Sequence, residues 1–274
     1  MSETGTEQRP LGLPSGRQPA PWVLRQRLAQ HTGRALVIGH RGAMGYRPEN
    51  TMPSFEHALA LGADCVEFDV HLTRDGVPVV IHDDAVDRTT NGHGLVRDHT
   101  LAELQRLDAG SWFGPDYAGA RIPTLDEVLD WARRSGMAVD VEIKNAPIYY
   151  LGIEEAVVSA LRRAAMSDNA IVTSFDHPAI KRVRELDPDL VLGVLYAARP
   201  ADVGVGLARL VGAQVLLPNV AYAREDDVRA AHAAGLSYVP WTTSDAERIC
   251  ELLKAGVDGV CSNHPDVVRQ TVAA

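Results

Sequence analysis

Short apolar runs alternate with amphipathic stretches along most of the chain. The runs predict buried strands, because a strand of a parallel sheet is covered on both faces and is therefore continuously apolar. The stretches between them have helical spacing. We expect strands at residues 35–38, 65–70, 137–143, 170–174, 190–195, 214–217, 237–241 and 259–261, and helices at 153–166, 178–186, 225–234 and 246–255.

Eight strand-then-helix units in about 240 residues predict an α/β fold, the (β/α)8 TIM barrel. A doubly wound parallel sheet is the alternative, since strand order cannot be read from periodicity. Residues 1–20 hold three prolines and three glycines without a periodic apolar pattern, which is typical of a flexible tail. We therefore expect one barrel domain over residues 21–274.

A further apolar run at 77–81 follows the second strand too closely for a helical crossover, so it predicts a β-hairpin. If the turn has four residues, Leu72 pairs with Val77, and Glu67 then lies opposite His82 on one face. Residues 84–122, rich in Gly, Asp and Thr, are interpreted as an insertion that carries a short helix at 100–107.

Composition limits the classes of partner and the location that we expect for the protein. With 27 Lys and Arg against 36 Asp and Glu the net charge is −9, so nucleic acid is not an expected partner. No run reaches the roughly 18 apolar residues of a membrane span. The N-terminus lacks the features of a signal peptide, so we expect a cytoplasmic protein. The three cysteines, Cys65, Cys250 and Cys261, have no metal or redox spacing and are interpreted as reduced thiols.

Ionisable residues gather where the first strands end, which in a barrel is the face that carries active sites. Three of them are carboxylates on neighbouring strands: Glu67, Asp69 and Glu142. Unpaired carboxylates in a barrel mouth would repel one another and bind protons, and a divalent cation removes that cost. All-oxygen ligation favours Mg²⁺ or Ca²⁺ over zinc.

The remaining residues at these ends suit phosphate chemistry. Arg41 and Lys144 supply fixed positive charge for a phosphate, and His40 and His82 can act as general base and general acid. Each residue alone has a structural interpretation as well; the pair of Glu142 and Lys144, for example, could be an internal salt bridge. Their joint position at the ends of three units and the hairpin favours an active site.

Several blocks resemble the signature of glycerophosphodiester phosphodiesterases. They are His40-Arg-Gly-Ala-Met-Gly-Tyr-Arg-Pro-Glu-Asn-Thr51, Glu67-Phe-Asp-Val-His-Leu-Thr-Arg-Asp-Gly76, Val79-Val-Ile-His-Asp83, Asp87-Arg-Thr-Thr-Asn-Gly92, Pro123-Thr-Leu-Asp-Glu-Val128 and Val141-Glu-Ile-Lys144. The resemblance implies a TIM barrel of the phospholipase-C-like type with one divalent cation. It also implies hydrolysis of glycerophosphodiesters to sn-glycerol 3-phosphate and an alcohol. Matched by motif, His40 and His82 are the acid–base pair, Glu67, Asp69 and Glu142 hold the metal, and Arg41 and Lys144 bind phosphate.

The C-terminal third departs from that pattern. The family's Trp-Thr-Val-Asn is here Trp241-Thr-Thr-Ser244, and its late Thr-Asp-x-Pro is Ser262-Asn-His-Pro265. Ser244, with a glutamate three residues on, can still cap the following helix. Asn263 lacks the charge of the family's aspartate. Trp241 ends a strand, so it is expected to line the alcohol side of the substrate pocket, with a plain core tryptophan as the alternative.

The sequence therefore predicts a metal-dependent phosphodiesterase acting on a small-molecule glycerophosphodiester. The nucleophile is either water or the substrate's own 2-hydroxyl. A lysophospholipase-D-like enzyme on lysolipids is one alternative, and a wide apolar mouth would favour it. A non-catalytic phosphate-binding module is another, but such a module would be expected to have lost a histidine or a metal ligand. The preferred alcohol, the choice between Mg²⁺ and Ca²⁺ and the oligomeric state are not indicated.

Overall fold

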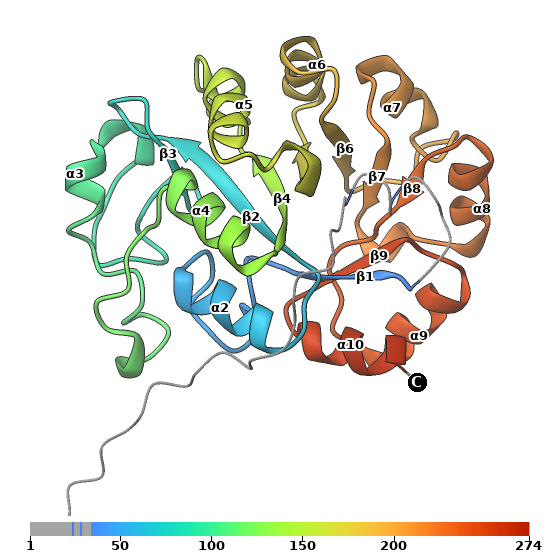
Figure 1. Cartoon of the computed structure of the whole chain (residues 1–274), viewed down its shortest axis with the longest axis horizontal. Coiled ribbons are helices and arrows are strands. Elements are labelled where there is room, and N and C mark those ends of the chain that lie inside the picture. Colours follow the sequence, from blue (N-terminus) through green and yellow to red (C-terminus); the bar gives the residue numbers. More distant parts are fainter. Residues whose placement is uncertain (1–23, 25–27, 29–33, 274) are drawn as a thin grey trace, which may run out of the picture.

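Eight parallel strands form a nearly closed barrel, which confirms the predicted TIM-barrel fold (Figure 1). The computed structural model describes residues 24, 28 and 34–273, so the predicted tail at residues 1–20 lies outside the described residues. Around the barrel the strands follow the order β8 (Ser237–Tyr238), β7 (Val215–Pro218), β6 (Val191–Tyr196), β5 (Ala170–Ser174), β4 (Ala138–Ile143), β2 (Cys65–Leu72), β1 (Leu36–Gly39) and β9 (Gly259–Ser262).

Backbone hydrogen bonds also join the two ends of this order. The Asp258 N–H donates to the Tyr238 carbonyl at 3.0 Å, and the Cys261 N–H donates to the Pro240 carbonyl at 3.1 Å. The sheet thus curls back on itself, which a doubly wound sheet does not do. Strand β8 is shorter than predicted because Pro240 has no N–H to give to a strand ladder.

Helices form the outer layer and cover the sheet with their apolar faces (Figure 1). Burying these faces supplies the main stabilising term of the fold. Phe55 shows the packing: its ring meets Phe68 of β2 edge-on and lies 5.9 Å from Trp131. The helices are α2 (Met52–Ala60), α3 (Leu101–Leu104), α4 (Leu125–Ser135), α5 (Ile153–Arg163), α6 (His177–Leu186), α7 (Val205–Val211), α8 (Glu225–Ala233), α9 (Ala246–Lys254) and α10 (Pro265–Ala273). No helix of the described residues is long and apolar enough to cross a membrane.

One expected helix cap is wrong. Ser244 does not cap α9; Asp245 does, because its carboxylate accepts from the backbone N–H groups of Glu247 at 2.9 Å and Arg248 at 3.3 Å. Aspartate caps as well as serine does. The Ser244 hydroxyl is left to bond the Ser262 hydroxyl, 3.0 Å away.

The hairpin after β2 exists, but its expected register is wrong by one residue. Strand β3 (Pro78–Val80) runs antiparallel to β2 and pairs Leu72 with Pro78 and Val70 with Val80. The turn has three residues rather than four, because the Thr73 N–H donates to the Val77 carbonyl at 3.1 Å and closes it. Gly76, at φ +77°, takes the left-handed position that such a turn requires.

This register moves Glu67 away from His82. Asp69 instead lies opposite Ile81, whose N–H donates to the Asp69 carbonyl at 3.0 Å. Because β3 ends at Val80, His82 is outside the ladder and its side chain is free to turn into the barrel mouth. Glu67 and His82 nevertheless line the same pocket, because a bend after β3, and not the pairing register, brings His82 to it.

The insertion at 84–122 has a small apolar core of its own against β3. Its predicted helix is confirmed in part, as the four-residue α3. The buried members are Val79, Ile81, Val86, Val96, Leu104, Ala109 and Ile122.

Candidate active site

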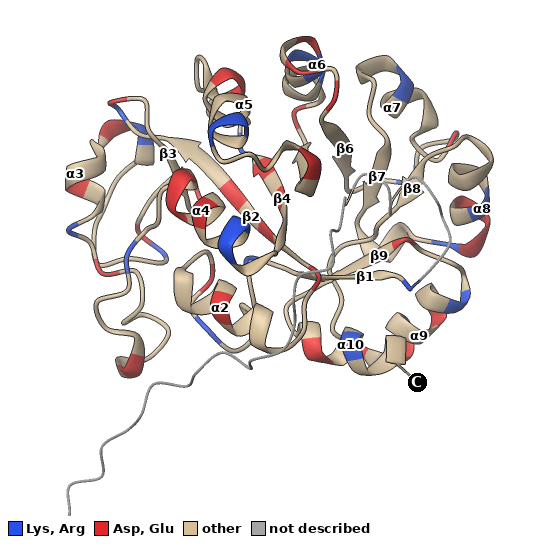
Figure 2. Cartoon of the chain, in the orientation of Figure 1, with Lys and Arg blue, Asp and Glu red and all other residues tan. Residues whose placement is uncertain are grey.

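Inward-facing positions change from apolar to acidic along two neighbouring strands. On β2 they read Cys65, Glu67 and Asp69, and on β4 Ala138, Asp140 and Glu142, with Glu67 paired to Asp140 and Asp69 to Glu142. Because alternate side chains share a face, the carboxylates stand together at the carboxyl ends of the strands. Figure 2 shows these acidic positions on β2 and β4, inside an outer layer of mixed charge.

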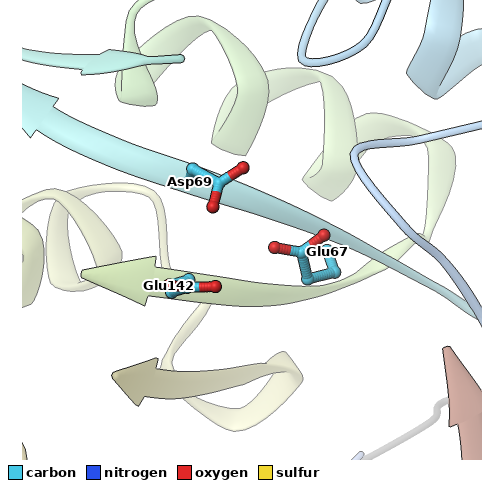
Figure 3. Close-up of side chains that lie close together, drawn as sticks. All are labelled: Glu67, Asp69 and Glu142. Carbon is cyan, nitrogen blue, oxygen red and sulfur yellow. The ribbon is translucent and has the colours of Figure 1, made fainter. Parts of the chain in front are cut away.

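Glu67, Asp69 and Glu142 form a compact buried cluster, in which one carboxylate oxygen from each lies within 4.8 Å of the others (Figure 3). Burial and the neighbouring carboxylates raise the pKa of Glu67 well above its usual range, and raise that of Glu142 to about 7. Asp69 differs: burial opposes its charge, but Lys144 and Arg41 outweigh burial and lower its pKa to about 2.

The cluster fits a divalent cation. Asp69 Oδ1 is buried and has no hydrogen-bond partner among the described residues; its nearest cation is the Lys144 ammonium at 3.5 Å. A metal ion would take such an oxygen as a ligand and would lower the repulsion that raises the pKa of the two glutamates.

Two cationic side chains flank the cluster. The Lys144 ammonium donates to Glu142 Oε1 at 2.8 Å. Arg41 is held by its backbone N–H, which donates to Glu67 Oε2 at 2.8 Å, and by its Nη1, which donates to Glu49 Oε1 at 2.8 Å. Burial opposes the charge of both cations, yet the adjacent carboxylates raise the pKa of each. Both remain positive beside the pocket.

His40 is fixed through one ring nitrogen. Its Nδ1 lies 2.7 Å from Asn263 Oδ1, and its Nε2 lies 3.9 Å from Glu67 Oε2. An amide oxygen can only accept, so Nδ1 donates and Nε2 carries the free electron pair of the neutral ring. Burial and then the Arg41 charge lower the pKa of His40 to about 4. At neutral pH the ring can therefore accept a proton at Nε2.

His82 is held from two sides. Its Nδ1 lies 2.6 Å from Asp83 Oδ1 and donates to it, which leaves Nε2 for the pocket. Its carbonyl accepts from His71 Nε2 at 3.0 Å. That bond makes His71 Nδ1 the acceptor for the Tyr150 hydroxyl, 2.8 Å away. The chain bend at His82 is therefore anchored to β2 and to the loop before α5.

These groups line one pocket of about 550 Å³ that is open to solvent. One wall is polar and carries His40, Arg41, Glu67, His82, Asp140, Glu142 and Lys144; the other is mainly apolar and carries Phe175, Leu195, Leu217, Trp241 and Cys261. Trp241 donates from Nε1 to the Leu217 carbonyl at 2.9 Å, and its ring meets Phe175 edge-on at 5.4 Å. The predicted residues thus come together, with Asp69 beside this lining in the carboxylate cluster and Trp241 in the apolar wall.

Three further residues belong to the site and were not predicted to do so: Asp140, Asp83 and Arg88. Asp140 has a pKa raised to about 7 by burial, against a hydrogen bond from Thr173; its alternation with Glu142 was the available signal. Asp83 directly follows His82 in the sequence. Arg88 gave no signal of this role because its partner Glu49 is distant in sequence. The amide of Asn50, which follows the first strand, also belongs to the site, because it donates to Asp69 Oδ2 at 2.8 Å.

A barrel with this site at the carboxyl ends of its strands is an α/β-barrel enzyme of the phosphodiesterase class, and comparisons with known proteins agree. Residues 40–267 match the glycerophosphoryl diester phosphodiesterase family, so the chain belongs to that family. A glycerophosphodiester phosphodiesterase of Caldanaerobacter subterraneus subsp. tengcongensis is 40% identical over 239 residues, covering 87% of this chain and 98% of that protein.

Solved structures share the fold. A phosphodiesterase of Oleispira antarctica, in complex with the product sn-glycerol-3-phosphate, superposes with a TM-score of 0.82 at 32% identity, covering 88% of this chain and 98% of that one. A glycerophosphodiester phosphodiesterase of Agrobacterium tumefaciens gives a TM-score of 0.77 at 29% identity, covering 88% of this chain and all of that one, 100%.

Proposed function

We propose that this enzyme hydrolyses glycerophosphodiesters to sn-glycerol 3-phosphate and an alcohol, using His40 and His82 as its acid–base pair. The observation that carries the proposal is the convergence at one pocket of three clustered carboxylates, two histidines and two partly buried cations. Seven ionisable groups gathered at one barrel mouth, three of them buried carboxylates, favour a bound ligand or metal that balances their charge.

Glu67, Asp69 and Glu142 would hold a single divalent cation, Mg²⁺ or Ca²⁺, because all three offer hard oxygen ligands. When bound, such a cation supplies a Lewis acid beside the phosphate. Arg41 and Lys144 are the chain's own contribution to phosphate binding. Their fixed positive charges stabilise the negative charge that accumulates on the phosphoryl oxygens during displacement.

The two histidines have different partners and therefore different roles. His40 is neutral with a free Nε2, which makes it the general base for the nucleophile, either a water or the substrate's 2-hydroxyl. His82 donates from Nδ1 to the Asp83 carboxylate, which leaves its Nε2 facing the pocket. We assign to His82 the role of general acid for the departing alkoxide.

The apolar wall places the alcohol group. Trp241 and Phe175, packed edge-on, belong to the apolar part of the pocket lining. We assign the alcohol side of the diester to this wall, with Trp241 as its main surface. The same wall favours a second candidate function, a lysophospholipase-D-like activity, because an acyl chain could lie along apolar side chains. A non-catalytic module is disfavoured, since both histidines and all three carboxylates are present. Cytoplasmic location stays a prediction from the sequence.

A release assay tests the proposal. Wild-type protein is incubated with glycerophosphocholine, glycerophosphoethanolamine, glycerophosphoinositol or lysophosphatidylcholine, each with Mg²⁺, Ca²⁺ or EDTA. We expect metal-dependent release of alcohol from the three glycerophosphodiesters. Exclusive turnover of lysophosphatidylcholine would favour the second candidate. No turnover of any substrate with either metal would contradict the proposal.

A further inference from the structure

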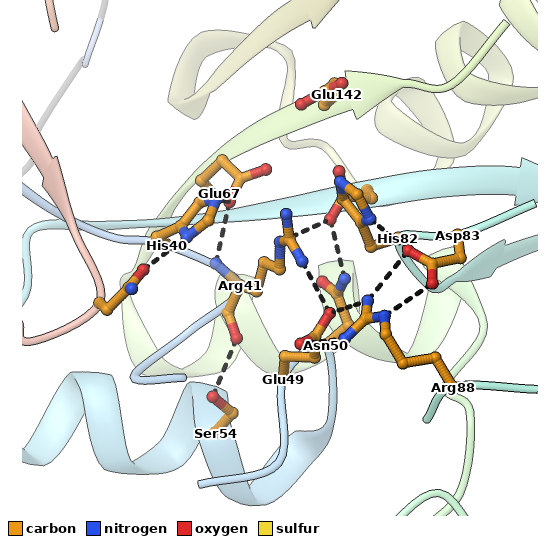
Figure 4. A network of polar contacts seen from close by, with 12 residues as sticks. His40, Arg41, Glu49, Asn50, Ser54, Glu67, His82, Asp83, Arg88 and Glu142 are labelled. Atoms are coloured by element: carbon orange, nitrogen blue, oxygen red, sulfur yellow. Dashed lines mark hydrogen bonds and ion pairs between the residues drawn. The ribbon is translucent and has the colours of Figure 1, made fainter. Parts of the chain in front are cut away.

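Arg88 joins two carboxylates that each hold a residue of the proposed site (Figure 4). Its Nη1 and Nη2 donate to the two oxygens of Glu49, both at 2.8 Å, and its Nε and Nη2 donate to the two oxygens of Asp83, at 2.6 and 3.0 Å. The guanidinium thus makes two bidentate pairs at once. A planar guanidinium can form this arrangement, whereas a lysine ammonium cannot.

Each of the two carboxylates also accepts a hydrogen bond from a residue that lines the pocket. Asp83 Oδ1 accepts from His82 Nδ1 at 2.6 Å, and Glu49 Oε1 accepts from Arg41 Nη1 at 2.8 Å. Hydrogen bonds from Arg88 hold the pKa of Asp83 far below its usual range, so Asp83 stays a carboxylate that accepts from His82. The Glu49 side chain is only 3% exposed, so its charge depends on both arginines for compensation.

The insertion has the apolar core described above, which includes Val86, two residues from Arg88. The Arg88 side chain itself is 44% exposed. The contacts that distinguish Arg88 are therefore those directed at the pocket.

We propose that Arg88 is a positioning residue that couples His82 to Arg41, by clamping Asp83 and Glu49 in one bidentate bridge. The proposal rests on the function proposed above, because it concerns residues assigned there. Through Asp83, Arg88 orients the His82 ring toward the leaving group. Through Glu49, it orients the Arg41 guanidinium toward the phosphate. One side chain of the insertion thereby sets the geometry of two barrel residues.

The first test is kinetic. Arg88→Met should lower kcat/KM by about 10- to 100-fold, the usual loss when a group that orients a site residue is removed. Arg88→Lys restores the charge but not the two bidentate pairs. Its kcat/KM should exceed that of Arg88→Met by less than tenfold. The matched control is Arg74→Met. Arg74 also bridges two groups nearby, the Asp98 carbonyl and Glu103, but on the exposed side of the insertion. The kcat/KM of Arg74→Met should equal that of the wild type.

A double-mutant cycle separates positioning from a structural role. If Arg88 acts on turnover through His82, then Arg88→Met should cause no further fall in kcat when it is added to His82→Ala. Arg88→Met should also raise KM, because it affects phosphate binding through Arg41. This rise in KM should persist when Arg88→Met is added to His82→Ala. An equal fall in kcat in both backgrounds, or wild-type kinetics in Arg88→Lys, would overturn the proposal. Melting temperatures of all variants show whether each one folds.

A second readout does not depend on activity. The short bond between His82 Nδ1 and Asp83 should give a downfield ring-proton resonance in protein carrying isotope-labelled histidine, and its absence from His82→Ala assigns it. We expect the signal in the wild type and Arg74→Met, and its loss in Arg88→Met. A signal that persists unchanged in Arg88→Met, or is absent from folded wild type, would overturn the proposal. If the wild type hydrolyses no diester, the proposed function fails, and the spectrum alone then decides whether Arg88 positions His82.

Discussion

Replacing Glu142 by glutamine distinguishes a metal ligand from the structural partner of a lysine. Glutamine keeps the shape of the side chain, removes one negative charge and is a weaker ligand. The Lys144 ammonium, 2.8 Å from Glu142, also lies 3.5 Å from Asp69 Oδ1. Lys144 therefore keeps a carboxylate partner in the variant, and the change is not expected to leave an unpaired buried charge.

The size of the stability change expected in Glu142→Gln follows from the pKa of Glu142. Burial and the Asp69 charge raise the pKa of Glu142 from 4.5 to about 7. A carboxyl group whose pKa is raised on folding contributes stability that is present below the unfolded pKa and is lost as the pH rises through the folded pKa. At pH 7 the ionised group lowers the free energy of unfolding of the metal-free protein by about 3 kcal/mol, since one pKa unit is about 1.4 kcal/mol. Glu142→Gln removes this cost.

Urea unfolding of the metal-free proteins measures the effect directly. Glu142→Gln should be more stable than the wild type by up to about 3 kcal/mol at pH 8, with little difference near pH 4.5. Metal at a hundredfold excess over Kd should add about 2.7 kcal/mol to the wild type and clearly less to the variant. Glu56→Gln, on the exposed face of α2, is the control and should change neither value. A destabilised metal-free Glu142→Gln with an undiminished metal response would refute the ligand assignment.

Three further predictions follow from the same site. His40→Ala and His82→Ala should each lower kcat by at least about 10²-fold in initial-rate assays; near-wild-type turnover would remove that histidine from the mechanism. EDTA should abolish hydrolysis, and Mg²⁺ or Ca²⁺ should restore it better than Zn²⁺; full activity after exhaustive chelation would count against a metal. Burial raises the pKa of Asp140 from 3.8 to about 7, so metal-free stability should fall as the pH rises over that range. Asp140→Asn should flatten this fall in urea unfolding, and an unchanged slope would show that Asp140 does not cause it.

The barrel could be predicted because its determinants are local. Continuous apolar runs separated by amphipathic helices specify buried parallel strands wherever they occur. The hairpin register depended instead on one turn. The bond from the Thr73 N–H to the Val77 carbonyl and the left-handed Gly76 shorten that turn by one residue, and a shift of one residue reverses every face of a strand.

The site was predictable as far as it follows the strands. Glu67 and Asp69 share a face through their spacing, and the strand ends meet at one edge. The contacts that orient these groups were not predictable, because Asn263 lies 223 residues from His40, and Arg88 lies 39 residues from Glu49. Only the folded chain shows that Asn263, despite lacking the charge of the family's aspartate, accepts from His40.

The proposed function requires that this pocket cleaves a glycerophosphodiester on the alcohol side of the phosphate. Phosphorus NMR of wild-type protein with glycerophosphocholine and Mg²⁺ or Ca²⁺ tests it most directly, because the spectrum identifies which ester bond breaks. We expect sn-glycerol 3-phosphate to accumulate in step with free choline, and EDTA to stop the formation of both. Formation of phosphocholine and glycerol, or an unchanged substrate signal with either metal, would contradict it.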